Sequence, residues 1–292
     1  MAQRFVLVTG ATGNQGGALT EALLAKGHRV RALTRKLDGA PAARLRSRGV
    51  EVVAGSFDDP KSLETAATGV DAVFALSTPF EGGTEAEIAQ GKALADAAQA
   101  AQVQHLVYSS VSDADRATGV PHFDSKYEVE QYIQGLDVPW TVVAPAFFFD
   151  NTLFPWIVAD LNEGRYRQPL PAGRGLQQIS KADIGRFNAL VIEKREPFLG
   201  QRINIAGDEV TGHEGAIALS KAIGRSIEYV EQPIAEVRAQ SEDLALMYEW
   251  FDRVGYSADI GALRRDYPEV GWTSFEDWAT VQDWQGILTA AA

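Results

Sequence analysis

The chain has 292 residues, of which 46% are hydrophobic, and its formal net charge is −12. This length suits one large domain, or a nucleotide-binding domain with a smaller second one. Basic residues gather only at 29–36 and 44–48, which argues against direct nucleic-acid binding through a broad basic face. There is no cysteine, which excludes disulfides, a thiolate nucleophile and a cysteine-ligated metal. Because no signal peptide and no apolar run of ~20 residues is recognised, we expect a cytoplasmic protein that does not bind membranes.

The first predicted element is a buried strand at residues 5–8, followed by glycines spaced Gly-x-x-Gly-x-x-Gly and a helix from 18 to 26. Gly10 permits the tight turn, Gly13 leaves out the Cβ that would block a pyrophosphate, and Gly16 lets helix and strand pack closely. The free N–H groups of the helix then face the anion. A glycine-rich turn without a ligand is the alternative, but the flanking strand and helix favour dinucleotide binding. We expect cofactor contacts from Gly10, Thr12, Gly13, Asn14, Gln15 and Gly16.

A second strand is expected at residues 28–35. The residues at its end determine whether the fold selects NAD or NADP(H). A fold that selects NAD places a carboxylate here to hold the ribose 2′-hydroxyl. This chain has Thr34, Arg35 and Lys36 instead. Since a guanidinium binds phosphate through two parallel N–H groups, these residues favour NADP(H). A solvated basic pair on a loop is the alternative.

Residues 41–49 are predicted to form a helix, and 50–54 a third strand. Asp59, directly before a proline, is a good N-cap for the next helix. We therefore place Phe57 and Asp58 among the cofactor-binding residues, with Asp58 free to contact the adenine amino group. An ordinary turn aspartate is the alternative for Asp58.

A fourth strand is expected at 71–76, after which the chain passes beneath the nicotinamide half of the cofactor. Contacts are expected from Ser77, Thr78 and Pro79. Thr84 and Glu87 have the spacing of a capping box that opens a long helix to about residue 101.

The fifth strand, 105–110, ends in two serines, and the sixth, 138–144, follows a helix at 121–133. Alternation of strand and helix at this rhythm predicts an α/β fold, a doubly wound parallel sheet of six strands with right-handed crossovers. Pro145 and Phe148, just beyond the sixth strand, complete the expected cofactor contacts. We expect a nucleotide-binding domain at 1–151 and a smaller α/β subdomain at 152–292, with some interleaving.

Beyond residue 151 the regular alternation fails. Short strands are expected near 176–179 and 201–205, with helices capped by Ser180/Asp183 and Thr211/Glu214. The C-terminal stretch is aromatic, and we expect either a packed accessory subdomain or residues that wall the ligand cleft outside the strand ends. These aromatics are Tyr248, Trp250, Phe251, Tyr256, Tyr267, Trp272, Phe275, Trp278 and Trp284.

Taken together, these residues resemble the NmrA-like family of atypical short-chain dehydrogenases over nearly the whole chain. The resemblance implies an NADP(H)-binding Rossmann domain with a small C-terminal domain, and the family includes redox-state sensors and reductases of quinones and related carbonyl compounds. It rests on residues 8–16, 34–35, 122–126, Glu128 and Glu130, 145–151, 183–185, 251–255 and 275–278.

In the wider superfamily a Tyr-x-x-x-Lys pair places a phenol and an ammonium on one helical face, where the lysine holds the nicotinamide ribose and activates the tyrosine. Here Lys126 is present, but position 122 is His122. The serine of that site would correspond to Ser109 or Ser110. An imidazolium could donate the proton, so the phenol function is either lost or replaced. Tyr108 and Tyr127 are the nearby tyrosines. We thus expect catalytic residues, if any, among Lys126, His122, Ser109 and Ser110.

No metal site is expected, because the four histidines are scattered, and no Gly-x-Ser-x-Gly serine-hydrolase motif occurs. Two functions stay open. The first is a redox-responsive regulatory protein that reports the NADPH/NADP+ ratio to a protein partner, and we lean to it because the tyrosine is missing. The second is an NADPH-dependent reductase of quinones, enones or carbonyls that uses Lys126 and a donor other than tyrosine. A small-molecule substrate or a regulatory protein is the expected partner, with a homodimer as an open alternative.

Overall fold

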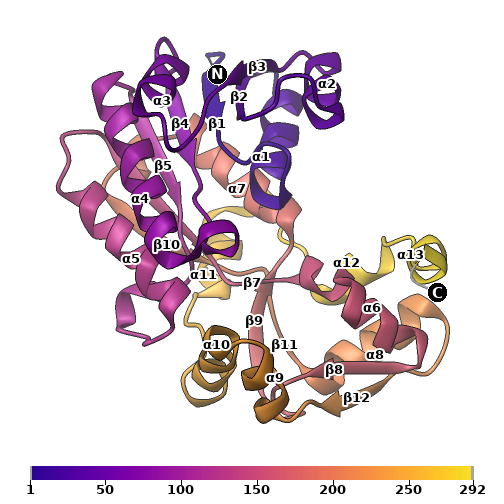
Figure 1. Cartoon of the computed structure of the whole chain (residues 1–292). Helices are drawn as coiled ribbons and strands as arrows, with labels where there is room; N and C mark the ends of the chain where they lie inside the picture. Colours follow the sequence, from indigo (N-terminus) through magenta and orange to yellow (C-terminus); the bar gives the residue numbers. More distant parts are fainter. Residues whose placement is uncertain (1, 291–292) are drawn as a thin grey trace. The chain divides into compact units, whose positions relative to one another are not determined.

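The computed structural model describes residues 2–290, and the chain divides into two compact units (Figure 1). The first unit holds the residues up to 117, 121–144 and 184–203, and the second holds 118–120, 145–183 and the residues from 204 on. The segment 184–203 therefore returns to the first unit after the chain has entered the second.

The first unit is built on a seven-stranded sheet with the order β10-β6-β5-β4-β1-β2-β3. The pairs from β6 to β3 in this order are all parallel, as βαβ crossovers require. The strands are β1 (Phe5–Val8), β2 (Arg29–Thr34), β3 (Glu51–Ala54), β4 (Ala72–Ala75), β5 (His105–Ser109), β6 (Trp140–Pro145) and β10 (Gln201–Ile205).

The expected six strands were one too few. The segment 201–205, which we assigned to the second domain, lies beside β6, where Gly200 N donates to Trp140 O over 2.7 Å. The alternation of strand and helix breaks in the sequence because residues 145–183 are inserted before the chain returns to this sheet. The doubly wound architecture itself is confirmed.

Helices cover both faces of this sheet, with α3, α4 and α5 on one side and α1 and α7 on the other (Figure 1). Under the first group lies a core that includes Val73, Leu94, Leu106 and Ile133. Each such side chain contributes ~1.5–3 kcal/mol by leaving water. The helices are α1 (Asn14–Ala25), α2 (Ala40–Ser47), α3 (Pro60–Ala67), α4 (Pro79–Ala100), α5 (Pro121–Gln134) and α7 (Lys181–Glu193), with 3-10 turns η1 (Ala114–Arg116) and η3 (Glu196–Phe198).

Gly185 explains how α7 packs against α1. A Cβ at this position would lie 2.4 Å from the carbonyl oxygen of Ala18, so only glycine permits this helix approach. The segment Asp183-Ile-Gly185, part of the family resemblance, therefore has a structural reason.

The second unit has a three-stranded sheet, β11-β9-β7, and a two-stranded one, β12-β8. Its strands are β7 (Phe147–Phe148), β8 (Arg165–Gln168), β9 (Gly175–Ile179), β11 (Asp208–Thr211) and β12 (Glu228–Glu231). Its helices are α6 (Pro155–Asn162), α8 (Gly212–Ile223), α9 (Ile234–Gln240), α10 (Glu242–Arg253), α11 (Ile260–Asp266), α12 (Phe275–Thr280) and α13 (Trp284–Ala290), with 3-10 turns η2 (Phe149–Leu153) and η4 (Pro268–Val270).

The C-terminal aromatics pack within the second unit. Phe275, Trp278 and Trp284 are buried in its core, and Phe251 contacts the ring of Tyr256 with 4.9 Å between centroids. The predicted capping box of α8 is confirmed, because Thr211 and Glu214 cap one another reciprocally. Packing within the second unit thus accounts for these five aromatic residues.

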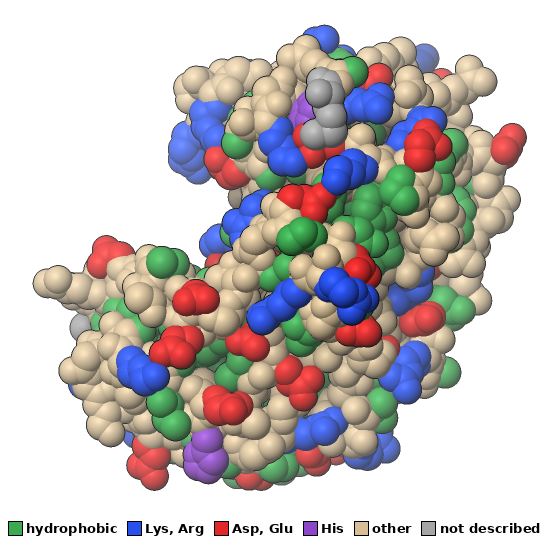
Figure 2. Space-filling view, turned by 180° about the vertical axis from the view of Figure 1, so that it is seen from behind, with side chains coloured by type: hydrophobic (Ala, Val, Ile, Leu, Met, Phe, Trp, Pro, Cys, Tyr) green, Lys and Arg blue, Asp and Glu red, His purple; other side chains and the backbone are tan. Residues whose placement is uncertain are grey.

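Acidic and basic side chains are interspersed on the face of the molecule shown in Figure 2, with no broad basic area among the described residues visible there. Among residues 2–290, no helix has the length and apolar character needed to cross a membrane.

Candidate dinucleotide-binding site

The glycine turn, residues 10–16, joins β1 to α1 at the carboxyl end of the sheet. Gly10 has a φ of +63°, and Gly13 caps the helix with its own N–H donating to Gly10 O at 2.9 Å. A Cβ on Gly16 would lie 2.5 Å from the backbone of Thr9 and Gly10, so helix and turn touch there. A Cβ on Gly13 would make only an ordinary 3.4 Å contact within the protein. The protein's own packing therefore demands glycine at Gly16 but not at Gly13.

The turn is held over the sheet by two polar links. Gln15 Oε1 accepts a hydrogen bond of 2.7 Å from the Ser109 hydroxyl at the end of β5. Thr9, which the sequence reasoning missed, uses its hydroxyl to accept from Leu76 N at 2.8 Å and so joins the ends of β1 and β4. Thr12 and Asn14 are exposed beside the first turn of α1, which carries no acidic side chain. The N–H groups there are thus free of a competing carboxylate, as an anion site requires.

Arg35 directly follows β2, and its guanidinium Nη2 lies 3.1 Å from Glu81 Oε2 on the first turn of α4. No carboxylate stands at the end of β2 itself, but Glu81 brings one from elsewhere in the chain. Thr34 and Lys36 are linked locally, because the Thr34 hydroxyl accepts from Lys36 N at 3.2 Å. Sequence reasoning identified Arg35 and missed Glu81, which is far away along the chain.

Two aspartates, Asp58 and Asp59, lie between β3 and α3 and differ in their contacts. Asp59 caps α3 by accepting from Ser62 N, as predicted. Asp58 is exposed, and Phe57 packs partly against the core of the first unit. Both stay proposals as cofactor-binding residues, with Asp58 proposed to contact the adenine amino group.

Helix α4 begins earlier than predicted, at Pro79, with Thr78 as its N-cap and a kink at Gly83, where φ is +83° and ψ is 178°. The prediction that Thr84 and Glu87 form a capping box was wrong, because Thr78 caps α4 and Glu87 does not take part in a cap. Its carboxylate is fully buried, with Oε2 accepting from the Ser125 hydroxyl at 2.5 Å and Oε1 lying 2.8 Å from Lys126 Nζ. The long-range ion pair replaces the local cap because Lys126 is itself buried and needs a counter-charge.

Lys126 Nζ also donates to the carbonyl oxygen of Ser77 at 3.1 Å, which ties α5 to the segment after β4. His122 lies one turn earlier on α5 and is buried, with its ring 4.8 Å from Phe123 and 6.1 Å from Phe80. His122 and Lys126 thus share a helical face, as expected from their spacing.

Tyr108 does not replace the missing phenol. It is fully buried on β5, and burial, with the charge of Glu87 adding to it, raises the pKa of its phenol far above the usual range. Tyr127 is half-buried and lies about 100° round the helix from Lys126. Neither offers an accessible phenol on the face of Lys126.

The two candidate serines have separate partners. Ser109 donates to Gln15 of the glycine turn, whereas Ser110 donates to Glu130, which also receives Arg202 Nε at 2.8 Å. Burial raises the pKa of the Glu130 carboxyl, and the charge of Arg202 opposes this. Ser110 and Lys126 thus bind different carboxylates, Glu130 and Glu87. Of the remaining predicted contacts, Pro145 ends β6 and Phe148 lies in β7; both belong to the second unit.

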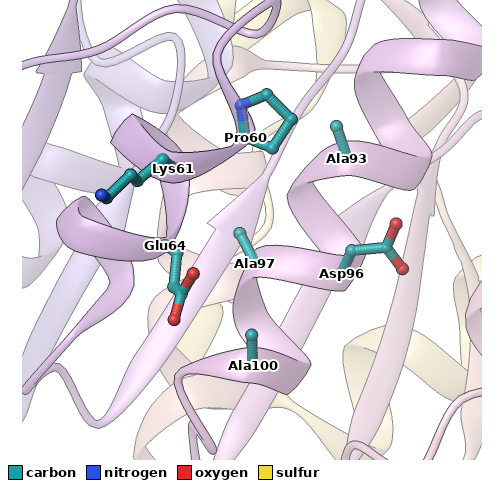
Figure 3. Close-up of a pocket in the computed structure, with 7 residues that line it drawn as sticks. All are labelled: Pro60, Lys61, Glu64, Ala93, Asp96, Ala97 and Ala100. Carbon is teal, nitrogen blue, oxygen red and sulfur yellow. The ribbon is translucent and has the colours of Figure 1, made fainter.

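None of the predicted site residues lines the groove between α3 and α4 (Figure 3). Its walls combine three charged side chains with small residues and a proline. The lining residues are Pro60, Lys61, Glu64, Ala93, Asp96, Ala97 and Ala100. Within residues 2–290, no three His, Cys, Asp or Glu side chains are placed to hold a metal ion.

Proteins of one family resemble this chain over most of its length. Residues 2–279 match the model of the NmrA-like family. The NAD(P)H azoreductase of Xenophilus azovorans is 32% identical over 226 residues, covering 77% of this chain and 76% of that protein. The nitrogen metabolite repression protein nmrA of Emericella nidulans is 29% identical over 261 residues, covering 81% and 70%. The crystal structure of NmrA, a negative transcriptional regulator, in complex with NADP has the same fold, with a TM-score of 0.78, 24% identity and coverage of 98% of this chain and 100% of that one. The chain belongs to the NmrA-like family.

Proposed function

We propose that this protein binds NADP(H) through the glycine turn and Arg35 and acts as a redox-responsive regulatory protein with weak or no classical dehydrogenase activity. The observation that carries the proposal is the state of Lys126. Its ammonium is paired with the buried carboxylate of Glu87, and no accessible phenol stands on its helical face among the described residues. The protein would respond to the NADPH/NADP+ ratio and pass this signal to a regulatory protein partner.

The residues present fit the cofactor. Gly13 leaves the space that a pyrophosphate needs, the first turn of α1 offers its N–H groups, and Arg35 suits the 2′-phosphate. Bound NADPH would supply a hydride at its nicotinamide ring. Lys126, held by Glu87 and the Ser77 carbonyl, would orient the ribose on the nicotinamide side. The solved NmrA relative that holds NADP supports this assignment.

One experiment separates a regulator from an enzyme. Binding of NADPH is measured by titration calorimetry, and NADPH consumption is followed by absorbance with quinones, azo compounds and conjugated carbonyls. Tight binding without turnover is the expected result. Steady turnover with any of these compounds would contradict the regulatory proposal.

A reductase is the second candidate, and one observation favours it. Phe80 is 77% exposed beside His122, so a planar conjugated substrate would find an aromatic face there. The azoreductase relative supports a reaction of this class. Lys126 would orient the cofactor, and His122 or water would deliver the proton.

Substitution of His122 tests which candidate holds. In a regulator, His122→Phe should leave NADPH affinity within about twofold, because the imidazole donates no proton to a substrate. In a reductase, the same change should lower kcat by ~10²-fold or more with the affinity retained. His122→Tyr is the companion variant, since it restores the phenol at i, i+4 from Lys126. Carbonyl reduction gained only in that variant would support a regulator built on an enzyme scaffold, whereas wild-type turnover that survives both changes would exclude His122 as the acid.

Replacing Arg35 by alanine should weaken NADPH binding roughly ten- to hundredfold, since a charge-assisted hydrogen bond contributes ~1.5–3 kcal/mol. NADH has no 2′-phosphate, so its affinity should change far less. Arg44→Ala removes the same charge from an exposed position on the nearby helix α2 and serves as the control. Calorimetric titration of the three proteins with both cofactors checks this. An equal loss for NADPH and NADH in Arg35→Ala would show that Arg35 does not read the phosphate.

A further inference from the structure

The ion pair of Arg35 and Glu81 links the segments that follow two strands of the sheet, β2 and β4. Arg35 follows β2 and Glu81 lies on the turn that follows β4, while β1 lies between these two strands. Their 3.1 Å contact therefore crosses above the end of β1, where the glycine turn begins. Both side chains are largely exposed, at 70% and 64%, so each can exchange its partner with a ligand.

Glu81 lies on a short turn that is set off from the rest of α4. Thr78 caps this turn, and Gly83 breaks the helix on its other side. A Cβ on Gly83 would meet nothing within 4 Å, so little packs against the backbone at the kink. The same turn carries Phe80, whose ring is 6.1 Å from that of His122. One short segment thus contacts Arg35 through Glu81 and the Lys126 face of α5 through Phe80.

We propose that Glu81 is a specificity-determining residue that competes with the 2′-phosphate of NADP(H) for Arg35, a role that rests on the proposed binding of this cofactor. A phosphate and a carboxylate both bind the guanidinium through its N–H groups, and the two anions repel one another at that distance. Binding of the 2′-phosphate therefore draws Arg35 away from Glu81. NADH, which carries a neutral 2′-hydroxyl, leaves the pair in place.

This exchange would link binding of the 2′-phosphate at Arg35 to a change in the segment that carries Phe80. Loss of the Arg35 contact releases the turn of residues 79–83, and with it Phe80, only when a 2′-phosphate is bound. The phosphate at the adenosine end would then change the exposed surface beside His122. Because exposed ion pairs are weak, the competition is expected to change affinity by about two- to fivefold.

Glu81→Gln tests the competition, with Glu85→Gln as a control that removes the same charge from an exposed position further along α4. The probes are adenosine 2′,5′-bisphosphate, which has the 2′-phosphate but no nicotinamide, and ADP, which has neither. We expect Glu81→Gln to bind the bisphosphate about two- to fivefold more tightly than wild type, with ADP affinity unchanged and Glu85→Gln like wild type. In an Arg35→Ala background the gain from Glu81→Gln should disappear.

A second readout follows the turn itself. The chain has no cysteine, so Phe80→Cys labelled with an environment-sensitive dye reports on this segment alone. Its emission should change on addition of the bisphosphate and not of ADP, and the change should be absent when Arg35 is alanine.

The outcomes distinguish a failure of the proposed role of Glu81 from a failure of the proposed cofactor binding. If wild type binds the bisphosphate but Glu81→Gln gains nothing over Glu85→Gln, the role of Glu81 is overturned while cofactor binding stands. If wild type binds neither the bisphosphate nor NADPH, the proposed function fails as well. A dye response to ADP equal to that to the bisphosphate would also overturn the role of Glu81, because the 2′-phosphate would then not be what moves the turn.

Discussion

Replacing Gly13 by valine should abolish NADPH binding while the protein stays folded. The backbone at Gly13 has a φ of −97°, which any residue adopts, and a Cβ there makes only an ordinary contact with Gly10. The added methyl groups instead fill the space where the pyrophosphate must approach α1. Loss of several charge-assisted hydrogen bonds, each ~1.5–3 kcal/mol, predicts an affinity more than about a hundredfold lower.

Gly16→Ala is the matched comparison, because it adds a smaller side chain three residues away with the opposite expected result. A Cβ at Gly16 meets backbone atoms at 2.5 Å, so the turn must shift and stability should fall by about 1–3 kcal/mol or more. Circular dichroism and urea unfolding measure the fold, and calorimetry measures NADPH binding. Full NADPH affinity in a folded Gly13→Val protein would place the phosphates elsewhere.

Removing the carboxylate of Glu87 should destabilise the first unit by about 3–5 kcal/mol, the usual effect of leaving one buried charge without its partner. Glu87 is fully buried, and its substitution by alanine leaves the ammonium of Lys126 and the hydroxyl of Ser125 without that acceptor. Urea unfolding of Glu87→Ala against wild type measures the loss.

Two further variants identify the cause of that loss. Glu85→Ala truncates an exposed glutamate on the same helix and should change stability by less than about 0.5 kcal/mol. The double variant Glu87→Ala/Lys126→Met removes both charges and should recover much of the stability, because a buried ion pair can be exchanged for apolar side chains at little net cost. A Glu87→Ala protein as stable as Glu85→Ala would show that Lys126 has no need of its buried partner.

Local sequence patterns predicted most of the secondary structure. The strand, glycine turn and helix at the N-terminus, the cap at Asp59 and the reciprocal cap of α8 all depend on residues close together in sequence. The structure has each of these elements, although α1 begins at Asn14, four residues earlier than predicted. The alternation of strand and helix predicted a doubly wound sheet, and helices do cover both of its faces (Figure 1). Such features depend on backbone propensity and spacing, which one sequence displays directly.

The errors came from contacts between distant residues. Glu87 had the spacing of a cap, but its carboxylate is drawn into the interior by Lys126 on another helix. Ser109 ends β5 and Ser110 directly follows it, and their side chains have different partners, Gln15 and Glu130. The strand at 201–205 returns to the first sheet after a long insertion. No local signal marks such pairings, because they depend on which elements the fold places side by side.

This NmrA-like protein is expected to bind NADP(H) and to recognise the cofactor's 2′-phosphate through Arg35. The most direct measurement is calorimetric titration of the wild-type protein with NADPH and, separately, with NADH under the same salt conditions. The account predicts that NADPH binds roughly ten- to hundredfold more tightly. Equal affinities for the two cofactors, or tighter binding of NADH, would contradict it.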